Sequence, residues 1–204
     1  MKDKTNVSNV YDKIAIKYSK EFSNPSEYLD FFLELIPKKG RILDFGCGVG
    51  VDSNYMFSKG FFVTGIDISK GMLEIARKNY PEVSFKLKDI RDIEENGVYD
   101  GIVASCSLIH IPKEEVPETL RKFNNLLNKR GIIYISLQEG SSEEVFVDEP
   151  FKPDEKLFLN IISFNEIKQL LDESNFSIIK HYQRKPKTKE ELNYNKLFII
   201  ARKK

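Results

Sequence analysis

The chain has 204 residues, of which 41% are hydrophobic and 31% are charged, and its 32 Lys and Arg nearly balance 31 Asp and Glu. This length predicts one domain, and the formal charge of +1 disfavours a nucleic-acid substrate because it gives no global basic field. Residues 1–11 are polar and no apolar run approaches the roughly 20 residues that span a bilayer, so we expect a cytoplasmic protein without a membrane segment.

Strand-like and helix-like segments alternate from about residue 28 onward. Apolar side chains at helical spacing predict helices over 28–35, 72–76, 116–127 and 167–171. Short apolar runs rich in Val, Ile and Phe predict buried strands at 41–45, 61–66, 83–87, 101–105 and 131–137. This alternation is typical of a largely parallel sheet with crossover helices.

Two more strands are predicted at 176–182 and 196–201. Only a polar loop separates them, and strands this close without an intervening helix form an antiparallel hairpin. Together the elements predict a Rossmann-like α/β fold. Its sheet is seven-stranded and mostly parallel, with helices on both faces and the C-terminal hairpin at one edge.

A glycine-rich turn follows the first predicted strand, with the sequence Asp44-Phe45-Gly46-Cys47-Gly48-Val49-Gly50. Glycines suit a strand that turns tightly into a helix while its backbone approaches a ligand. A turn without any ligand is the alternative, but about 20 residues later Asp67 ends the second predicted strand. An ionised Asp at that place can accept hydrogen bonds from both hydroxyls of a ribose. The pattern therefore indicates a ligand that contains a nucleoside.

The spacing of the glycines disfavours two kinds of nucleotide site. Nicotinamide and flavin enzymes carry G-x-G-x-x-G, and counting from Gly46 the third glycine falls on Val51. The chain also lacks the G-x-x-x-x-G-K-[ST] loop of nucleoside triphosphate enzymes. A pattern of Asp-x-Gly-x-Gly-x-Gly remains.

With this pattern, residues 8–204 resemble the class I S-adenosylmethionine-dependent methyltransferases, Rossmann-like enzymes of the small-molecule type. The resemblance implies that Asp44 orients the loop and the amino group of the ligand. It also implies that Gly46 and Gly48 make room for the methionine part. A carboxylate near a cationic amine fits the electrostatics.

Further matches to that family follow in order along the chain. Asp67-Ile68-Ser69 with Gly71-Met72-Leu73 resembles the ribose-binding acid and the start of the next helix, which Ser69 can cap. Lys88-Asp89-Ile90 resembles the segment that binds adenine, and Ser105 begins the loop beside the transferred methyl group. The resemblance thus implies S-adenosyl-L-methionine as cofactor, S-adenosyl-L-homocysteine as product, and as cofactor-binding residues Asp44, Gly46, Cys47, Gly48, Gly50, Asp67, Ile68, Met72, Asp89, Ile90 and Ser105.

The same loop holds His110, the candidate catalytic residue, which can act as a general base if the acceptor arrives protonated. Cys106 follows Ser105 rather than a proline, which argues against the nucleophile of a cytosine methyltransferase, and Asn-Pro-Pro-Tyr is absent. Two cysteines are too few for a cysteine-based zinc site, so no metal site is predicted. We expect a structural role for Asp100 at the start of its strand.

We expect residues 1–204 to form a single methyltransferase domain. Its parts are an N-terminal helical cap (1–37), a cofactor-binding core (40–137), an acceptor-side insertion (138–163), and a C-terminal helix and hairpin (164–204). Tyr11 and Tyr18 in the cap are candidate substrate residues. The insertion favours an amine acceptor if its acids face the site, but a solvated acidic loop is the preferred interpretation; these acids are Glu139, Glu143, Glu144, Asp148, Glu149, Asp154 and Glu155.

The functional prediction is methyl transfer from S-adenosyl-L-methionine to a small-molecule acceptor that the sequence leaves unidentified, with no nucleic-acid or membrane partner. Catalysis needs mainly positioning and exclusion of water, because the sulfonium carbon is already electrophilic. One alternative is a non-catalytic sensor or partner subunit that binds S-adenosylmethionine. A nucleotide-cofactor oxidoreductase is another, and Val51 argues against it.

Overall fold

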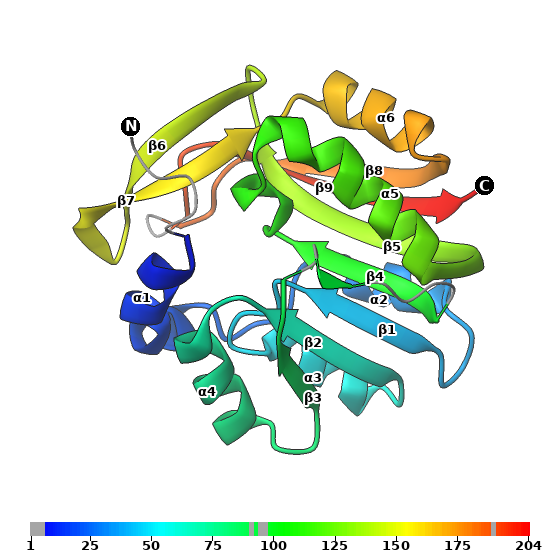
Figure 1. The fold of residues 1–204 in the computed structure, drawn as a ribbon, viewed down its shortest axis with the longest axis horizontal. Helices are drawn as coiled ribbons and strands as arrows, with labels where there is room; N and C mark the ends of the chain where they lie inside the picture. Colours follow the sequence, from blue (N-terminus) through cyan, green and yellow to red (C-terminus); the bar gives the residue numbers. More distant parts are fainter. Residues whose placement is uncertain (1–6, 90–91, 94–97, 189–190) are drawn as a thin grey trace.

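A computed structural model describes residues 7–89, 92–93, 98–188 and 191–204. Over these residues the chain forms a seven-stranded sheet in the order β3-β2-β1-β4-β5-β9-β8 (Figure 1). The strands are β1 Arg41–Phe45, β2 Phe62–Asp67, β3 Ser84–Leu87, β4 Tyr99–Ser105, β5 Leu127–Glu139, β8 Phe176–Arg184 and β9 Asn195–Lys203. Strand β9 is antiparallel to both of its neighbours, and the other neighbouring strands are parallel. The predicted mostly parallel sheet with a hairpin at one edge is confirmed.

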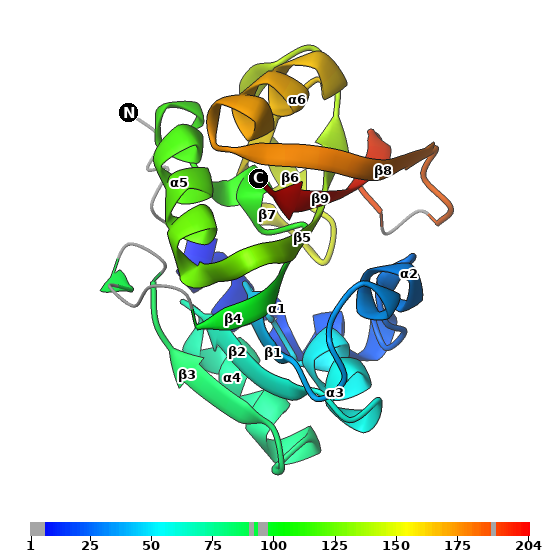
Figure 2. The same cartoon turned by 90° about the vertical axis from the view of Figure 1, so that its right-hand side faces the viewer.

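Helices cover both faces of this sheet, with α5 and α6 on one side and α2 and α3 on the other (Figure 2). The helices are α1 Val7–Glu21, α2 Leu29–Glu34, α3 Val51–Ser58, α4 Lys70–Asn79, α5 Val116–Leu126 and α6 Phe164–Glu173. Ser69 caps α4 as predicted, because its hydroxyl accepts a hydrogen bond from the backbone N–H of Met72. Among the described residues, no helix has the length and apolar character needed to cross a membrane.

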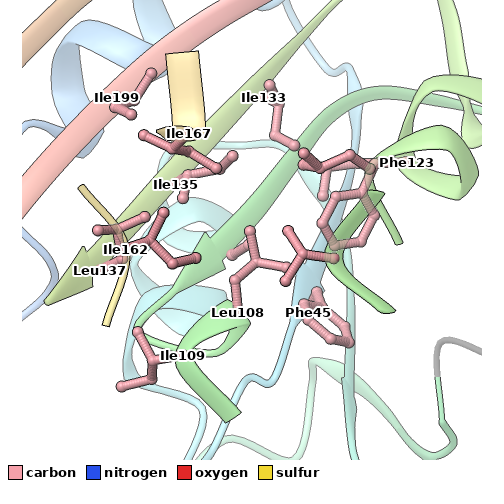
Figure 3. Packing of buried hydrophobic residues seen from close by; sticks show 14 of the residues in the cluster. Phe45, Leu108, Ile109, Phe123, Ile133, Ile135, Leu137, Ile162, Ile167 and Ile199 are labelled. Carbon is pink, nitrogen blue, oxygen red and sulfur yellow. The ribbon is translucent and has the colours of Figure 1, made fainter. Parts of the chain in front are cut away.

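The core under α5 and α6 extends to the carboxyl ends of the strands. There a short 3₁₀ turn, Leu108–His110, follows β4. Figure 3 shows Leu108 beside Phe45 in a buried cluster that also contains Ile109 and the isoleucines of β5, and the side chains of Leu108 and Ile109 are fully or almost fully buried. Burying two such side chains stabilises the turn by roughly 1.5–3 kcal/mol each. The core therefore fixes the backbone that carries His110.

Strand β5 is longer than predicted, and Leu127 corrects the predicted helix boundary. Helix α5 ends at Leu126, and Leu127 already pairs with Tyr99 of β4. The apolar periodicity that predicted Leu127 to be helical reflects the burial of its side chain. A residue that begins a strand at this position is buried equally well, so periodicity alone does not distinguish the two. The register then shifts before Gly101, so the two strands pair again from Gly101 and Ile132 onward.

The segment 138–163 is not a solvated acidic loop, and this prediction was wrong. It contains a two-stranded antiparallel sheet of β6, Glu143–Glu149, and β7, Lys152–Ile161. The last five residues of β7, 157–161, are buried, and Phe158 packs on Phe146 across the pair. The prediction weighed the acids and overlooked the apolar residues between them. Most of these acids do lie at the surface, where Asp148 pairs with Lys156 and Asp154 with Lys152.

Candidate active site

The glycine turn connects the end of β1 to the start of α3. Gly46 has φ 66° and Gly48 has φ 52°, a backbone region in which residues with a Cβ are strained. A Cβ added to Gly46 would meet Ser107 Cβ at 2.5 Å, so glycine is also required there by packing. A Cβ on Gly48 would meet no described atom within 4 Å. Gly48 therefore leaves open space on the side where a ligand can approach the backbone.

Asp67 links the ends of β1 and β2. One of its carboxylate oxygens accepts a hydrogen bond from the Gly48 N–H and the other from the Ser69 N–H, both at 2.8 Å. Burial raises the pKa of Asp67. Because a carboxylate offers about four acceptor sites, Asp67 can also accept a hydrogen bond from a ligand.

Asp44 is buried at the end of β1, with 1% of its surface exposed. Its carboxylate accepts a 2.5 Å hydrogen bond from the hydroxyl of Ser53 in α3. Burial and the neighbouring carboxylate of Asp52 raise the pKa of Asp44 to about 8. A ligand cation beside this group would favour its charged form, so the site suits a protonated amine.

Two adjoining cavities lie at the carboxyl ends of the strands. The smaller cavity has a volume of about 170 Å³ and the larger about 440 Å³. Predicted site residues line the smaller one, namely Tyr11, Tyr18, Gly46, Gly48, Asp67, Ile68, Met72, Asp89, Ser105 and His110. The larger cavity shares Tyr11, Tyr18, Gly46, Gly48 and Ser105 and adds Asp44 and Cys47. Gly50 lines neither cavity, and Ile90 lies outside the described residues.

His110 is held between two partners. Its Nδ1 lies 3.0 Å from the carbonyl oxygen of Phe158 in β7, and its Nε2 lies 2.8 Å from the hydroxyl of Tyr11 in α1. A carbonyl only accepts, so Nδ1 carries the proton and Nε2 accepts the hydrogen bond from Tyr11. Burial lowers the pKa of His110 to about 4, so the imidazole is neutral at physiological pH. Burial also raises the pKa of Tyr11, which therefore keeps its proton.

Sequence reasoning placed residues 1–37 on the acceptor side but missed Ser26, which lies between α1 and α2. Ser26 donates its backbone N–H (2.7 Å) and its hydroxyl (2.6 Å) to the two carboxylate oxygens of Asp52 in α3. The Ser26 hydroxyl oxygen also lies 2.7 Å from that of Ser105. Asp52, immediately after the glycine turn, could have been identified by its position. No local pattern in the sequence marks Ser26, because its partners lie 26 and 79 positions away.

Aromatic side chains from α1 and from the turn between β6 and β7 form another wall of the larger cavity. Phe151 makes edge contacts with Tyr18 at 6.4 Å and with Phe22 at 5.9 Å between ring centroids. Lys17 fixes the turn by donating to the Phe151 carbonyl oxygen at 3.0 Å. This wall brings the predicted residue Tyr18 together with two rings that sequence reasoning did not single out.

The end of β8 and the start of β9 complete the larger cavity. They contribute Arg184 and Lys196, and β5 contributes Gln138 beside them. The antiparallel direction of β9 brings its first residues to the edge of the sheet at which β1 and β4 end. Sequence reasoning predicted this hairpin but gave none of its residues a place in the site.

The chain is similar to known proteins along most of its length. A family model described as a methyltransferase domain matches residues 18–181. A putative methyltransferase of Bacillus subtilis is 32% identical over 151 residues, which are 70% of this chain and 61% of that protein. The chain thus spans less than two thirds of the length of this relative.

Solved structures share the fold. A crystal structure of an S-adenosylmethionine-dependent methyltransferase from Methanosarcina mazei has a TM-score of 0.77 at 18% identity, covering 88% of this chain and 98% of that chain. The 1,6-didemethyltoxoflavin-N1-methyltransferase of Burkholderia thailandensis, with 1,6-didemethyltoxoflavin and S-adenosylhomocysteine bound, has a TM-score of 0.65 at 18% identity. That comparison covers 96% of this chain and 79% of that chain.

Proposed function

The chain belongs to the methyltransferase domain family, and from this premise we propose that it transfers a methyl group from S-adenosyl-L-methionine to a small-molecule acceptor. The observation that carries the proposal is the hydrogen bond from the Gly48 N–H to Asp67 at 2.8 Å. It holds a ribose-type acid against a glycine turn whose open side lines both cavities. This arrangement suits a nucleoside with an amino-acid tail better than a dinucleotide, for which Val51 replaces the third glycine.

The residues present fit such a cofactor on three counts. Asp44 is a buried carboxylate that lacks a cationic partner among the described residues, which suits the ammonium group. The open side of Gly48 leaves room for the chain that carries it. The Ser107 hydroxyl lines the smaller cavity and has no hydrogen-bond partner among the described residues. In the proposal, Gly46 and Cys47 border the methionine part, Asp67 and Ile68 the ribose, Met72, Asp89 and Ile90 the adenine, and Ser105 the transferred methyl group.

When bound, the cofactor supplies an electrophilic methyl carbon on sulfur. The described residues then act by positioning the acceptor and keeping water out, which can provide most of the acceleration. Tyr18, Phe22 and Phe151 are suited to this because they form an apolar wall. Gly50 lies outside both cavities and, with φ 83°, forms the turn that leads into α3.

For an acceptor that arrives protonated, His110 acts through Tyr11. The Tyr11 oxygen takes the proton of the acceptor while its own proton passes to His110 Nε2, which it already contacts at 2.8 Å. The number of protons on Tyr11 is unchanged, and the imidazole ends as a cation. Because its pKa is only about 4, His110 is a weak base, and we expect it to contribute modestly.

The larger cavity supports a small acceptor. Its volume of about 440 Å³ falls within the roughly 300–1,000 Å³ of small-molecule sites. The segment 138–163 and the N-terminal segment 1–37 both contribute side chains to it, in line with their proposed position on the acceptor side. The Burkholderia thailandensis methyltransferase, which is named for 1,6-didemethyltoxoflavin and has it bound, supports this class.

A thermal-shift titration tests the proposal. At about 100 times its dissociation constant, S-adenosylhomocysteine should stabilise the protein by roughly 2.7 kcal/mol, which raises the Tm by several degrees. NAD at the same concentration is the control. A Tm raised by NAD and unchanged by S-adenosylhomocysteine would favour the oxidoreductase alternative. Binding without methyl transfer from labelled cofactor to any acceptor in a metabolite extract would favour the non-catalytic sensor.

A further inference from the structure

Three polar side chains form a row at the carboxyl edge of the sheet. Gln138 of β5 pairs with Lys196 of β9, and Lys196 pairs with Arg184 of β8. Directly opposed residues of antiparallel strands project from the same face, so the three side chains lie side by side. All three line the larger cavity.

The charge of Arg184 is neutralised within the protein. Its guanidinium donates to both carboxylate oxygens of Glu191, at 2.8 and 2.6 Å, and to Glu27 at 2.6 Å. Through Glu27 it anchors the segment between α1 and α2. Packing and charge pairing within the protein thus fully explain Arg184.

Lys196 differs from Arg184 because no carboxylate in the described part of the chain is in direct contact with it. It is half-buried beside Arg184, and among the described residues no carboxylate lies within 4 Å of its ammonium group. The sulfur of Cys106 and the more distant Glu191 raise the pKa of Lys196, so it is a cation at neutral pH. Because no carboxylate of the described residues is in direct contact with this ammonium group, it can pair with a negatively charged group of a ligand that enters the larger cavity.

Gln138 provides an independent observation. Only 8% of its surface is exposed, and its Oε1 has no hydrogen-bond partner among the described residues. A buried amide left unpaired destabilises a protein by roughly 1–3 kcal/mol. Rotation by 180° lets this amide present either its oxygen or its two N–H donors to the cavity.

We infer that Lys196 and Gln138 form a carboxylate-binding subsite, and that the methyl acceptor is a small carboxylic acid. This inference rests on the proposed function and deepens it by naming the acceptor class. The Lys196 ammonium pairs with the carboxylate, and the Gln138 amide donates to it after the 180° rotation that puts Nε2 in the place of the unpaired Oε1. A phosphate dianion fits less well, because Lys196 balances one negative charge and the second would be repelled by Asp52 and Glu191, which lie close enough to Lys196 to interact with its charge.

The position of the subsite assigns it to the acceptor rather than to the cofactor. The carboxylate of the cofactor shares a carbon atom with the ammonium group that we assign to Asp44, at the end of β1. Lys196 is on β9, which is three strands from β1 in the sheet. At about 4.8 Å between neighbouring strands, the backbones at the two positions are roughly 14 Å apart.

The experiment uses the full chain saturated with S-adenosylhomocysteine. Benzoate, phenylacetate and indole-3-acetate are the probes, and the amide of each is its uncharged control. We expect the acids to raise the Tm of the complex more than their amides do. Lys196→Met should weaken acid binding by about 10-fold or more and leave the affinity for S-adenosylhomocysteine within about twofold. Lys185→Met, an exposed charge loss outside both cavities, should change neither.

Two results would overturn the inference while leaving the proposed function intact. One is an equal response of the complex to acids and amides, or no response to either. The other is a loss of S-adenosylhomocysteine affinity of 10-fold or more in Lys196→Met, which would assign the lysine to the cofactor. Failure of the wild-type protein to bind S-adenosylhomocysteine at all would instead remove the proposed function, and this inference with it.

Discussion

The two halves of the candidate site are built differently. In the half at the ends of β1 and β2, the glycine turn, Asp44 and Asp67 lie close together in sequence, and backbone geometry does most of the positioning. In the half formed by α1, β6–β7 and β8–β9, side chains from distant segments meet. The contact between Tyr11 and His110 joins residues 99 positions apart.

This difference explains why only one half could be predicted from the sequence. A positive φ and a strand-to-helix turn require glycines at a fixed spacing, which is a local sequence pattern. A contact between side chains from distant segments has no such local pattern. We therefore expect substitutions in the first half to act mainly on cofactor affinity, and those in the second half to act on turnover.

The largest effect is expected for Gly46→Val. The side chain would be forced into φ 66° and against Ser107 Cβ, so S-adenosylhomocysteine binding should fall below detection by calorimetry. Gly60→Val is the control, because Gly60 also has positive φ, at 91°, but lies outside both cavities. It should lower the Tm and preserve affinity. Detectable binding by a folded Gly46→Val protein would contradict the close approach proposed for this turn.

Asp67→Ala should weaken S-adenosylhomocysteine binding by roughly 10- to 100-fold, because hydrogen bonds to a charged acceptor are worth about 1.5–3 kcal/mol. Asp100→Ala is a matched control. Asp100 also accepts two hydrogen bonds, from the Arg41 N–H and the Asn128 amide, but lines neither cavity. It should cost stability and leave affinity unchanged. If the two variants behave alike, Asp67 has only a structural role.

Affinity for S-adenosylhomocysteine should rise with pH between 6 and 8. The ligand ammonium favours ionised Asp44, whose pKa of about 8 in the free protein means that binding below this pH must release a proton. The slope should approach tenfold per pH unit at most. The same raised pKa predicts that Asp44 contributes stability at low pH that is lost as pH rises from about 4 to about 8. Asp44→Asn should flatten both dependences in calorimetry and in thermal melts, and a flat wild-type profile would argue against Asp44 as the ammonium partner.

The smallest effect is expected for His110→Ala. With the acceptor in hand, kcat should fall by less than about 100-fold, and S-adenosylhomocysteine affinity should stay within about threefold. Tyr11→Phe keeps the ring and removes the donor. If Tyr11 relays the proton, the double variant should lose no more than either single one. An affinity loss in His110→Ala as large as that in Asp67→Ala would contradict the expectation that the second half of the site acts on turnover rather than on cofactor affinity.

The fold was more predictable than the site. Hydrophobic periodicity was enough for the seven-stranded sheet, because each strand and helix buries a locally visible apolar pattern. It failed at Leu127, where a helix and a strand would bury the side chain equally well. It also failed in segment 138–163, where the prediction weighed the acids and overlooked the apolar residues of β7. For the site, most of the cofactor-binding residues predicted from local motifs line the two cavities. Ser26, Gln138 and Lys196 could not be found, since their significance depends on neighbours supplied by the folded chain.

The position of β9 between β5 and β8 has a consequence for folding during synthesis. Strand β8 leaves the ribosome before the strand that will join it to the sheet. At roughly 5–20 residues per second, β5 waits for several seconds with an open edge before residues 195–203 emerge. An unpaired edge of this kind can recruit another chain. During that interval, the backbone groups on the open edge of β5 in a nascent chain are available for pairing with another chain.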